Sequence, residues 1–165
     1  MRRKDREMDE DFAMQVAEKC SYGVLSMILP DGRPYGVPLS VCRMGNSMYF
    51  HCAMSGQKTE ALGQNPQVSL TCVGTVKPYP SGFTMEYESA VITGTAVPVT
   101  EETEKLAALR TICEKYCPEN MDAFEASAAR SLPRTAVWRI EIVSITGKRK
   151  KYDAEGKEMT FGRME

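Results

Sequence analysis

The residues best suited to chemistry lie in residues 49–58, where a strand-like run passes into a short helix. The helix is expected over 55–63, with Ser55 as its N-cap. Gly56 precedes the helical turn and Lys58 lies within it. Free amide N–H groups at a helix start, with an ammonium beside them, can hold a phosphate dianion. The alternative is an ordinary solvated lysine, and the spacing alone leaves both interpretations open.

His51 lies in the same run and is the only histidine of the chain. Its imidazole is the one side chain whose unperturbed pKa lies near neutrality, which makes it the natural group to deliver a proton to a reduced substrate. The alternative is a hydrogen-bonded strand residue without a role in proton transfer. Cys52 points to the opposite face of the strand, where we expect packing rather than redox chemistry. A metal site built on several histidines is excluded.

Other catalytic patterns are missing from the sequence. It contains no G-x-S-x-G nucleophile elbow, no Walker loop with G-K-[ST] and no G-x-G-x-x-G, so hydrolase and nucleoside-triphosphatase functions lose their main support. Cys113 and Cys117 share one face of an expected helix, but no second pair has zinc-like spacing, so both are expected in the core and no metal is expected. The basic clusters at 2–4 and 148–151 lack interleaved aromatic residues and are expected to be solvated, without nucleic-acid binding.

The composition is typical of one globular domain over 1–165, with polar terminal segments at about 1–8 and 148–165. A formal net charge of −1 provides no overall field that would attract nucleic acid or an anionic membrane. The N-terminal residues through Asp11 are charged and lack an apolar stretch, so we expect a cytoplasmic protein without a membrane span. The six dispersed cysteines are expected to be reduced thiols.

Periodicity along the chain predicts the elements that must position these residues. The strands are expected at 23–29, 35–43, 47–53, 67–76, 83–97 and 135–146. The helices are expected at 9–20 behind Asp9, at 55–63, from Thr100 to before Pro118, and from Asn120 to about Ser131. Six extended segments, with helices inserted before the last, favour a closed or nearly closed antiparallel barrel over a parallel Rossmann sheet.

Several short motifs follow one another across most of the chain. They are residues 1–8 (MRRKDREM), 22–25 (YGVL), 31–40 (DGRPYGVPLS), 49–53 (YFHCA), 56–58 (GQK), 87–91 (YESAV), 94–96 (GTA) and 145–148 (ITGK). In order and spacing this set resembles the FMN-binding, nitroimidazole-resistance-like branch of the pyridoxamine 5'-phosphate oxidase superfamily.

The resemblance implies a mainly β fold, namely a six-stranded antiparallel split β-barrel with flanking helices. It also implies a homodimer that binds FMN in a cleft at the subunit interface. The FMN phosphate would meet Lys58. The edge of the isoalloxazine would be lined by Val37, Pro38, Leu39 and Ser40, and the next strand would contribute His51, Cys52 and Ala53. Weaker candidates on the later strands are Thr71, Glu88 and Ser89.

One residue departs from the family pattern, because Gln57 stands where the family often has a histidine before the lysine. Glutamine can donate a hydrogen bond to a phosphate or a ring carbonyl, but it cannot carry a positive charge or move a proton near neutral pH. We therefore expect FMN binding to survive at this position and proton transfer to be lost.

The function implied by the resemblance is an FMN-dependent oxidoreductase, which passes reducing equivalents from a donor to a small electron-poor substrate such as a nitroaromatic compound. A second interpretation is an FMN-binding protein without turnover, acting as a store, sensor or chaperone, and Gln57 slightly favours it. A third is pyridoxamine phosphate oxidase activity proper, which the short chain disfavours. Another flavin, or a haem, in the same cleft also stays open.

Overall fold

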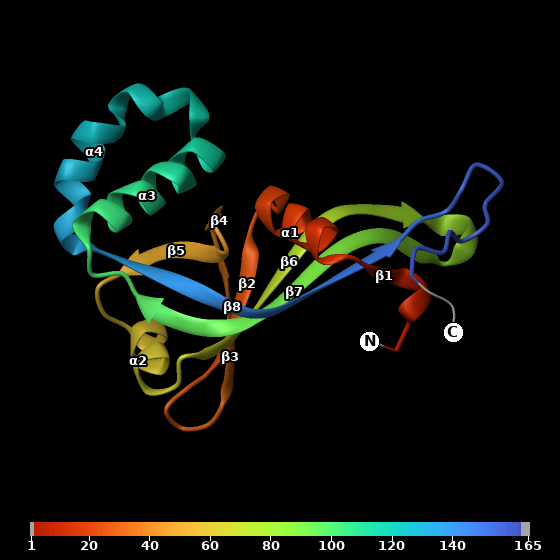
Figure 1. Ribbon diagram of the computed structural model, residues 1–165, viewed down its shortest axis with the longest axis horizontal. Helices are drawn as coiled ribbons and strands as arrows, with labels where there is room; N and C mark the ends of the chain where they lie inside the picture. Colours follow the sequence, from red (N-terminus) through yellow and green to blue (C-terminus); the bar gives the residue numbers. More distant parts are fainter. Residues whose placement is uncertain (1, 163–165) are drawn as a thin grey trace.

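Among residues 2–162, which the computed structural model describes, eight strands form one antiparallel sheet with helices around it (Figure 1). The strands are β1 (Glu7–Met8), β2 (Gly23–Ile28), β3 (Pro34–Leu39), β4 (Val41–Met44), β5 (Ser47–Ala53), β6 (Gln67–Tyr79), β7 (Thr84–Pro98) and β8 (Thr135–Lys150). The α-helices are α1 (Glu10–Lys19), α2 (Gln57–Gln64), α3 (Glu102–Tyr116) and α4 (Phe124–Ser131). Their order across the sheet is β3-β2-β6-β7-β8-β5-β4, and β1 pairs with β8.

The sheet is not closed by hydrogen bonds, since β3 and β4 are its two end strands. These strands are consecutive in the chain and joined at Ser40, so the chain bends there and passes from one end of the sheet order to the other. We call this bend the barrel corner. The strand expected over 35–43 is therefore two strands with different partners, β3 with β2 and β4 with β5. This division, together with the short β1, corrects the expected six strands to eight. The mainly β antiparallel class with flanking helices, inserted before the last strand, is confirmed.

Alternation along the strands buries one face of the sheet in a first core. Its fully buried members from five strands are Leu25, Phe50, Leu70, Ile92 and Ile140. α1 lies on this face and adds Ala13 and Val16 to the core (Figure 1). The carboxylate of Asp9 accepts a hydrogen bond of 2.8 Å from the amide of Phe12, which confirms the expected N-cap.

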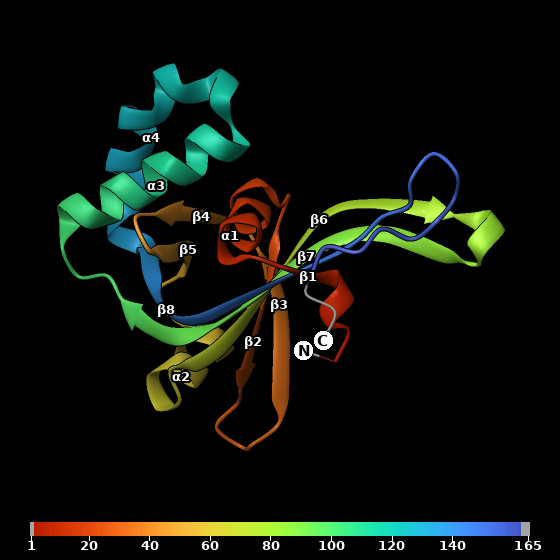
Figure 2. The same ribbon diagram turned by 45° about the vertical axis from the view of Figure 1, so that its right-hand side comes forward.

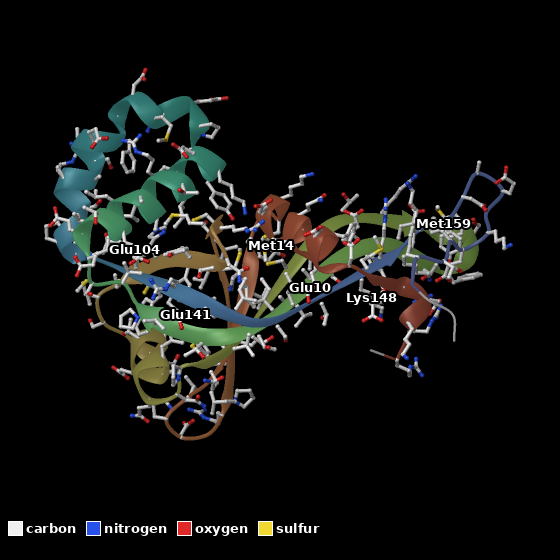
Figure 3. All side chains as sticks on the ribbon, in the orientation of Figure 1. Glu10, Met14, Glu104, Glu141, Lys148 and Met159 are labelled. Carbon is white, nitrogen blue, oxygen red and sulfur yellow. The ribbon has the colours of Figure 1, made fainter. Side chains whose placement is uncertain are left out.

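A second core lies on the other side of β5, under residues 102–131, which we call the helical layer (Figure 1). Its buried members include Tyr49, Leu109, Ile112, Phe124 and Val137. Glu104, in the first turn of α3, ties the layer to the sheet (Figure 3). Its carboxylate accepts from the Tyr49 hydroxyl over 2.8 Å and from the Arg139 guanidinium over 2.7 Å.

The helices of the helical layer do not start at the N-caps that the sequence predicted. α3 follows Glu101 rather than Thr100, and no side chain caps it. Residues Pro118–Ala123 form a 3-10 helix that includes Asn120, so α4 starts only at Phe124. Proline suits the first turn of a helix because its missing N–H would have no partner there, and this starts the turn before Asn120 can act as a cap.

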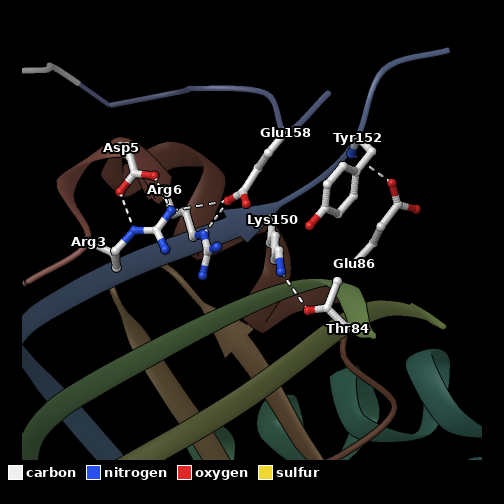
Figure 4. A network of polar contacts seen from close by, with 8 residues as sticks. All are labelled: Arg3, Asp5, Arg6, Thr84, Glu86, Lys150, Tyr152 and Glu158. Carbon is white, nitrogen blue, oxygen red and sulfur yellow. Dashed lines mark hydrogen bonds and ion pairs between the residues drawn. The ribbon is translucent and has the colours of Figure 1, made fainter. Parts of the chain in front are cut away.

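β6, β7 and the end of β8 continue past the rest of the sheet as an arm, which lies opposite the helical layer and ends in the hairpin between β6 and β7 (Figure 2). The C-terminal segment runs along this arm, and the rings of Tyr79 and Tyr152 stack with centroids 4.1 Å apart. Glu158 reaches back to the Arg6 guanidinium, 2.5 Å away (Figure 4). β8 extends to Lys150, whose buried ammonium donates to the Thr84 hydroxyl. The expectation of a solvated basic segment from residue 148 was therefore wrong.

All six cysteines are free thiols, which agrees with the expected reduced state. Within residues 2–162, no helix is long and apolar enough to cross a bilayer. Over the same residues, no cluster of three or more histidine, cysteine or acidic side chains is arranged to hold a metal ion.

Candidate functional site

The junction between β5 and α2 has the strand-to-helix form that the sequence predicted. Gly56, not Ser55, occupies the N-cap, with a φ of 138° that side chains rarely allow. Glycine has no side chain to bond the first amide N–H groups of α2, and no side-chain cap replaces it. These donors therefore stay available to an external acceptor at the positive end of the helix.

Lys58 stands over the end of β5 rather than extending into solvent. It is half-buried, and its ammonium lies 5.7 Å from the centroid of the Phe50 ring, a distance typical of a cation–π contact. Gln57 precedes it and is exposed at the start of the helix. An ammonium, a side-chain amide and uncapped backbone N–H groups thus belong to the first turn of one helix, and donors of these kinds can hold a phosphate.

The four candidate residues at 37–40 lie at the end of β3 and at the barrel corner, which leads into β4. Val41 of β4 pairs with Phe50 of β5 in an antiparallel ladder. Ser40 precedes Val41 and His51 follows Phe50, so these two residues lie opposite each other just beyond this pair. Strand alternation divides the candidates between two faces. Val37 and Leu39 pack half-buried against the first core, whereas Pro38 is exposed on the outer face.

His51 and Cys52 lie on opposite faces of β5, as expected from the strand period. His51 is exposed and faces the helical layer, where it lines a cavity. The surrounding protein nonetheless desolvates the imidazole and lowers the pKa of His51, and the Lys58 ammonium lowers it further. Cys52 packs against the first core, and burial raises the pKa of its thiol, which supports a packing role. Ala53 is exposed at the end of the strand.

The three candidates on the later strands do not share one face. Thr71 pairs with Val91, two residues from Ser89 on β7, so Thr71 and Ser89 point to the outer face of the sheet. Glu88 points to the face that α1 covers, and its carboxylate lies 3.3 Å from the Arg149 guanidinium. The structure therefore brings Thr71 and Ser89 to one surface and leaves Glu88 in a separate ion pair.

That surface, which we call the open sheet face, consists of two adjacent rows of residues across β3, β2, β6, β7 and β8. The rows are Pro38, Val24, Thr71, Val91 and Thr146, and Gly36, Ser26, Ser69, Thr93 and Ser144. None of the ten is charged, and α1 packs on the opposite face of the sheet. The open sheet face is thus an uncharged surface of mostly small and β-branched side chains.

A family model described as pyridoxamine 5'-phosphate oxidase matches residues 9–149. The chain belongs to the pyridoxamine 5'-phosphate oxidase family. The family expected from the motifs is therefore confirmed, and the match spans every strand of the sheet except β1 and the end of β8. A search of curated proteins finds no match.

Solved structures share the fold of this family member at low identity. A candidate 5-nitroimidazole antibiotic resistance protein from Bacteroides thetaiotaomicron VPI-5482 has a TM-score of 0.70 at 21% identity, over 87% of this chain and 86% of that one. A flavocytochrome from Azotobacter vinelandii has a TM-score of 0.72 at 19% identity, over 95% and 78%. A FAD- and heme-binding protein from Mycobacterium smegmatis has a TM-score of 0.75 at 17% identity, over 96% and 84%.

The part of the site that sequence reasoning missed in this pyridoxamine 5'-phosphate oxidase family member is the cavity beside His51. It measures about 320 Å³ and lies between β5 and the helical layer. Cys113, expected in the core, does pack against the second core but also lines this cavity, and Cys117 is exposed. The helical spacing of Leu109 and Ile112 indicated a packing face, but no sequence signal marked the gap that the face leaves open.

Proposed function

We propose that this chain binds FMN where β5 meets α2 and that it reduces small electron-poor aromatic molecules with electrons from a separate donor. The observation that carries the proposal is the start of α2. There, Gly56 leaves the first amides uncapped and the Lys58 ammonium is held over Phe50. In a member of the pyridoxamine 5'-phosphate oxidase family, this donor set suits the phosphate of a flavin mononucleotide.

The other candidate residues have distinct roles in this proposal. Gln57 donates a neutral hydrogen bond to the phosphate or to a ring carbonyl. The corner residues Val37 to Ser40 follow the edge of the ring, and Cys52 and Ala53 adjoin it from β5. FMN supplies the redox chemistry when bound, while the protein orients it and excludes water. Structural relatives whose names include a flavocytochrome and a FAD- and heme-binding protein support a flavin here and keep haem as the rival cofactor.

His51 is the proton donor in this proposal. Its lowered pKa makes the imidazolium a stronger acid than an ordinary histidine, at the cost of a smaller protonated fraction at neutral pH. Its position at the wall of a cavity gives an acceptor molecule access to the ring. Gln57 cannot replace it, since an amide does not titrate in this range.

We also propose that the protein is a homodimer whose second copy packs on the open sheet face. Val91, at the centre of this face, remains 38% exposed in the single chain, and its neighbours are uncharged. An uncharged sheet surface of small and β-branched residues suits packing against a second copy, because burying it costs little desolvation. Pro38, Thr71 and Ser89 would then lie at or near the subunit interface.

A non-catalytic FMN store or sensor is the second candidate, and Gln57 is the observation that favours it. The absorption spectrum of the purified protein and the identity of the released cofactor test the shared part of both functions. Steady-state oxidation of a reduced nicotinamide with a nitroaromatic acceptor separates them, because a pure binder would be reduced once and then stop. A haem spectrum in place of a flavin spectrum would overturn the cofactor assignment.

A further inference from the structure

The cavity beside His51 shares β5 with the proposed FMN site, and the rest of it is built by elements that the FMN site does not use. Its walls come from α3, the 3-10 turn and α4, and its floor comes from β5 and the start of β8. At about 320 Å³ it lies near the lower end of the roughly 300–1,000 Å³ typical of small-molecule pockets. It therefore has room for a molecule of one or two rings.

The lining of the cavity is apolar with a few neutral polar groups. Leu109, Ile112, Met121 and Phe124 supply the apolar walls. His51, Asn120 and Ser127 add an imidazole, an amide and a hydroxyl. Among the described residues that line the cavity, none is aspartate, glutamate, lysine or arginine. A charged guest would give up part of its hydration here and would find no opposite charge to offset that loss.

The aromatic wall of the cavity is fixed in place from outside. The Arg110 guanidinium lies 4.5 Å from the centroid of the Phe124 ring, and it also pairs with the Glu125 carboxylate. Arg110 belongs to α3 and the other two residues to α4, so this contact clamps the two helices together. Phe124 is only 7% exposed and lines the cavity, so its ring is a preformed part of the apolar wall.

We propose that the cavity between β5 and the helical layer binds a small, uncharged aromatic molecule that stacks near Phe124 and accepts hydrogen bonds from Ser127 or Asn120. The guest contacts His51, so its binding changes the surroundings of the only imidazole of the chain. The cavity shares His51 with the proposed reduction, but Lys58 and α2 do not line it, so binding of the guest can be tested apart from binding of FMN.

Three probes of nearly identical size and shape test whether the cavity prefers an uncharged guest. Benzamide is neutral, benzoate is an anion and benzamidine is a cation at pH 7.5. Each is titrated into the purified protein, and the ring signals of His51 are followed by NMR, where a single histidine needs no assignment. Benzamide is expected to shift these signals to saturation, and the two ions are expected to bind at least about tenfold more weakly.

Matched variants on α4 test the location. Ser127→Trp fills the cavity and is expected to weaken benzamide binding by about tenfold or more. Ala126→Trp puts the same side chain on an exposed position of the same helix outside the cavity, and binding is expected to change less than about twofold. Should Ser127→Trp fail to fold, Ala123→Trp, at another exposed lining position, replaces it. Lys58→Ala is expected to retain benzamide binding even if it loses FMN.

Equal affinity for the three probes would overturn the proposal, as would unchanged benzamide binding in the cavity-filling variant. Loss of benzamide binding in Lys58→Ala would show that the guest occupies the flavin site instead. A protein without FMN that still binds benzamide would uphold this inference while the proposed FMN function fails, so the two outcomes are distinguishable.

Discussion

The hydroxyl of Tyr116 bonds both backbone polar groups of Val41, accepting from the amide N–H and donating to the carbonyl, each over 3.1 Å. Val41 is the first residue of β4, directly after the bend at Ser40. The Lys115 ammonium adds a 2.8 Å bond to the same carbonyl. The end of α3 thus satisfies backbone groups at the corner where the barrel path changes partners, and it supports the residues proposed to border the flavin.

Tyr116→Phe is expected to destabilise the protein by about 1–3 kcal/mol, because it leaves the partly buried Val41 amide without its acceptor. The Lys115 ammonium still donates to the Val41 carbonyl, so the loss of stability comes mainly from the unpaired Val41 N–H. Urea unfolding followed by circular dichroism measures the effect. Tyr22→Phe, at a residue 53% exposed, is the control and should change stability little. Equal stability of the Tyr116 variant and the wild type would mean that water replaces the hydroxyl.

Lys58→Ala is expected to weaken FMN binding by roughly 10- to 100-fold, the loss of one charge-assisted contact to phosphate. Riboflavin lacks the phosphate, so its affinity should change much less. Fluorescence titration of both flavins gives the comparison directly. Lys77→Ala removes an exposed lysine on the arm and serves as the control. An equal loss for FMN and riboflavin would contradict the placement of Lys58 at the phosphate.

The imidazole of His51 is expected to titrate below the ordinary histidine pKa of about 6.5, mainly because the surrounding protein partly desolvates its charged form and secondarily because of Lys58. NMR titration of this single histidine measures the value. Lys58→Ala should raise the pKa of His51 without restoring it fully, since desolvation remains. A pKa at or above that of a free histidine would contradict the desolvation of the ring.

The same shift has a signed effect on stability. Because the folded protein binds the proton less tightly than the unfolded chain, this residue lowers stability as pH falls through the ordinary histidine pKa toward the lowered one. Above the ordinary pKa both states are neutral and the effect vanishes. His51→Gln should remove this part of the pH dependence, as seen from unfolding midpoints at acidic and neutral pH.

Much of the fold could be predicted because its signals are local. The turn at 30–32 and the alternation of β2 predicted the first hairpin, and Asp9 predicted the start of α1. The bend at Ser40 could not be predicted in this way. The residue after the bend, Val41, is bonded through its backbone by Tyr116, which lies 75 residues further along the sequence.

The candidate site shows the same division. Lys58 and its helix start could be found from neighbouring residues, since a helix terminus is a local feature. Strand alternation places Glu88 and Ser89 on opposite faces once β7 is known, whereas the family resemblance implied that both residues lie at the cofactor. The cavity beside His51 required the packing of α3 on α4, and packing between helices leaves no periodic mark of the space that it encloses.

Val91→Lys is expected to convert the proposed dimer into monomers, because it places a charge at the centre of the open sheet face. Light scattering at micromolar concentration should then give one chain mass for the variant and two for the wild type. Ala107→Lys adds the same charge at an exposed position of α3 and should leave the mass unchanged. A wild-type protein that is monomeric with FMN fully bound would refute an interface site.

The last prediction separates His51 from Gln57, which lie on the two sides of the β5–α2 junction. If His51 delivers a proton during reduction of the acceptor, His51→Ala should slow turnover by roughly 100-fold and leave FMN affinity within a few-fold. Gln57→Ala should instead change FMN affinity or the reduction potential through one lost hydrogen bond, with the pH profile unchanged.

Paired pH–rate profiles, with FMN occupancy checked for each variant, measure this difference. The wild-type rate should fall as pH rises through the lowered pKa of His51, since the acid form is then lost. In His51→Ala that decline should disappear together with most of the activity, whereas Gln57→Ala should retain the wild-type decline. Full activity of His51→Ala across roughly pH 5–8 would mean that the ring is structural and that water or the substrate supplies the proton.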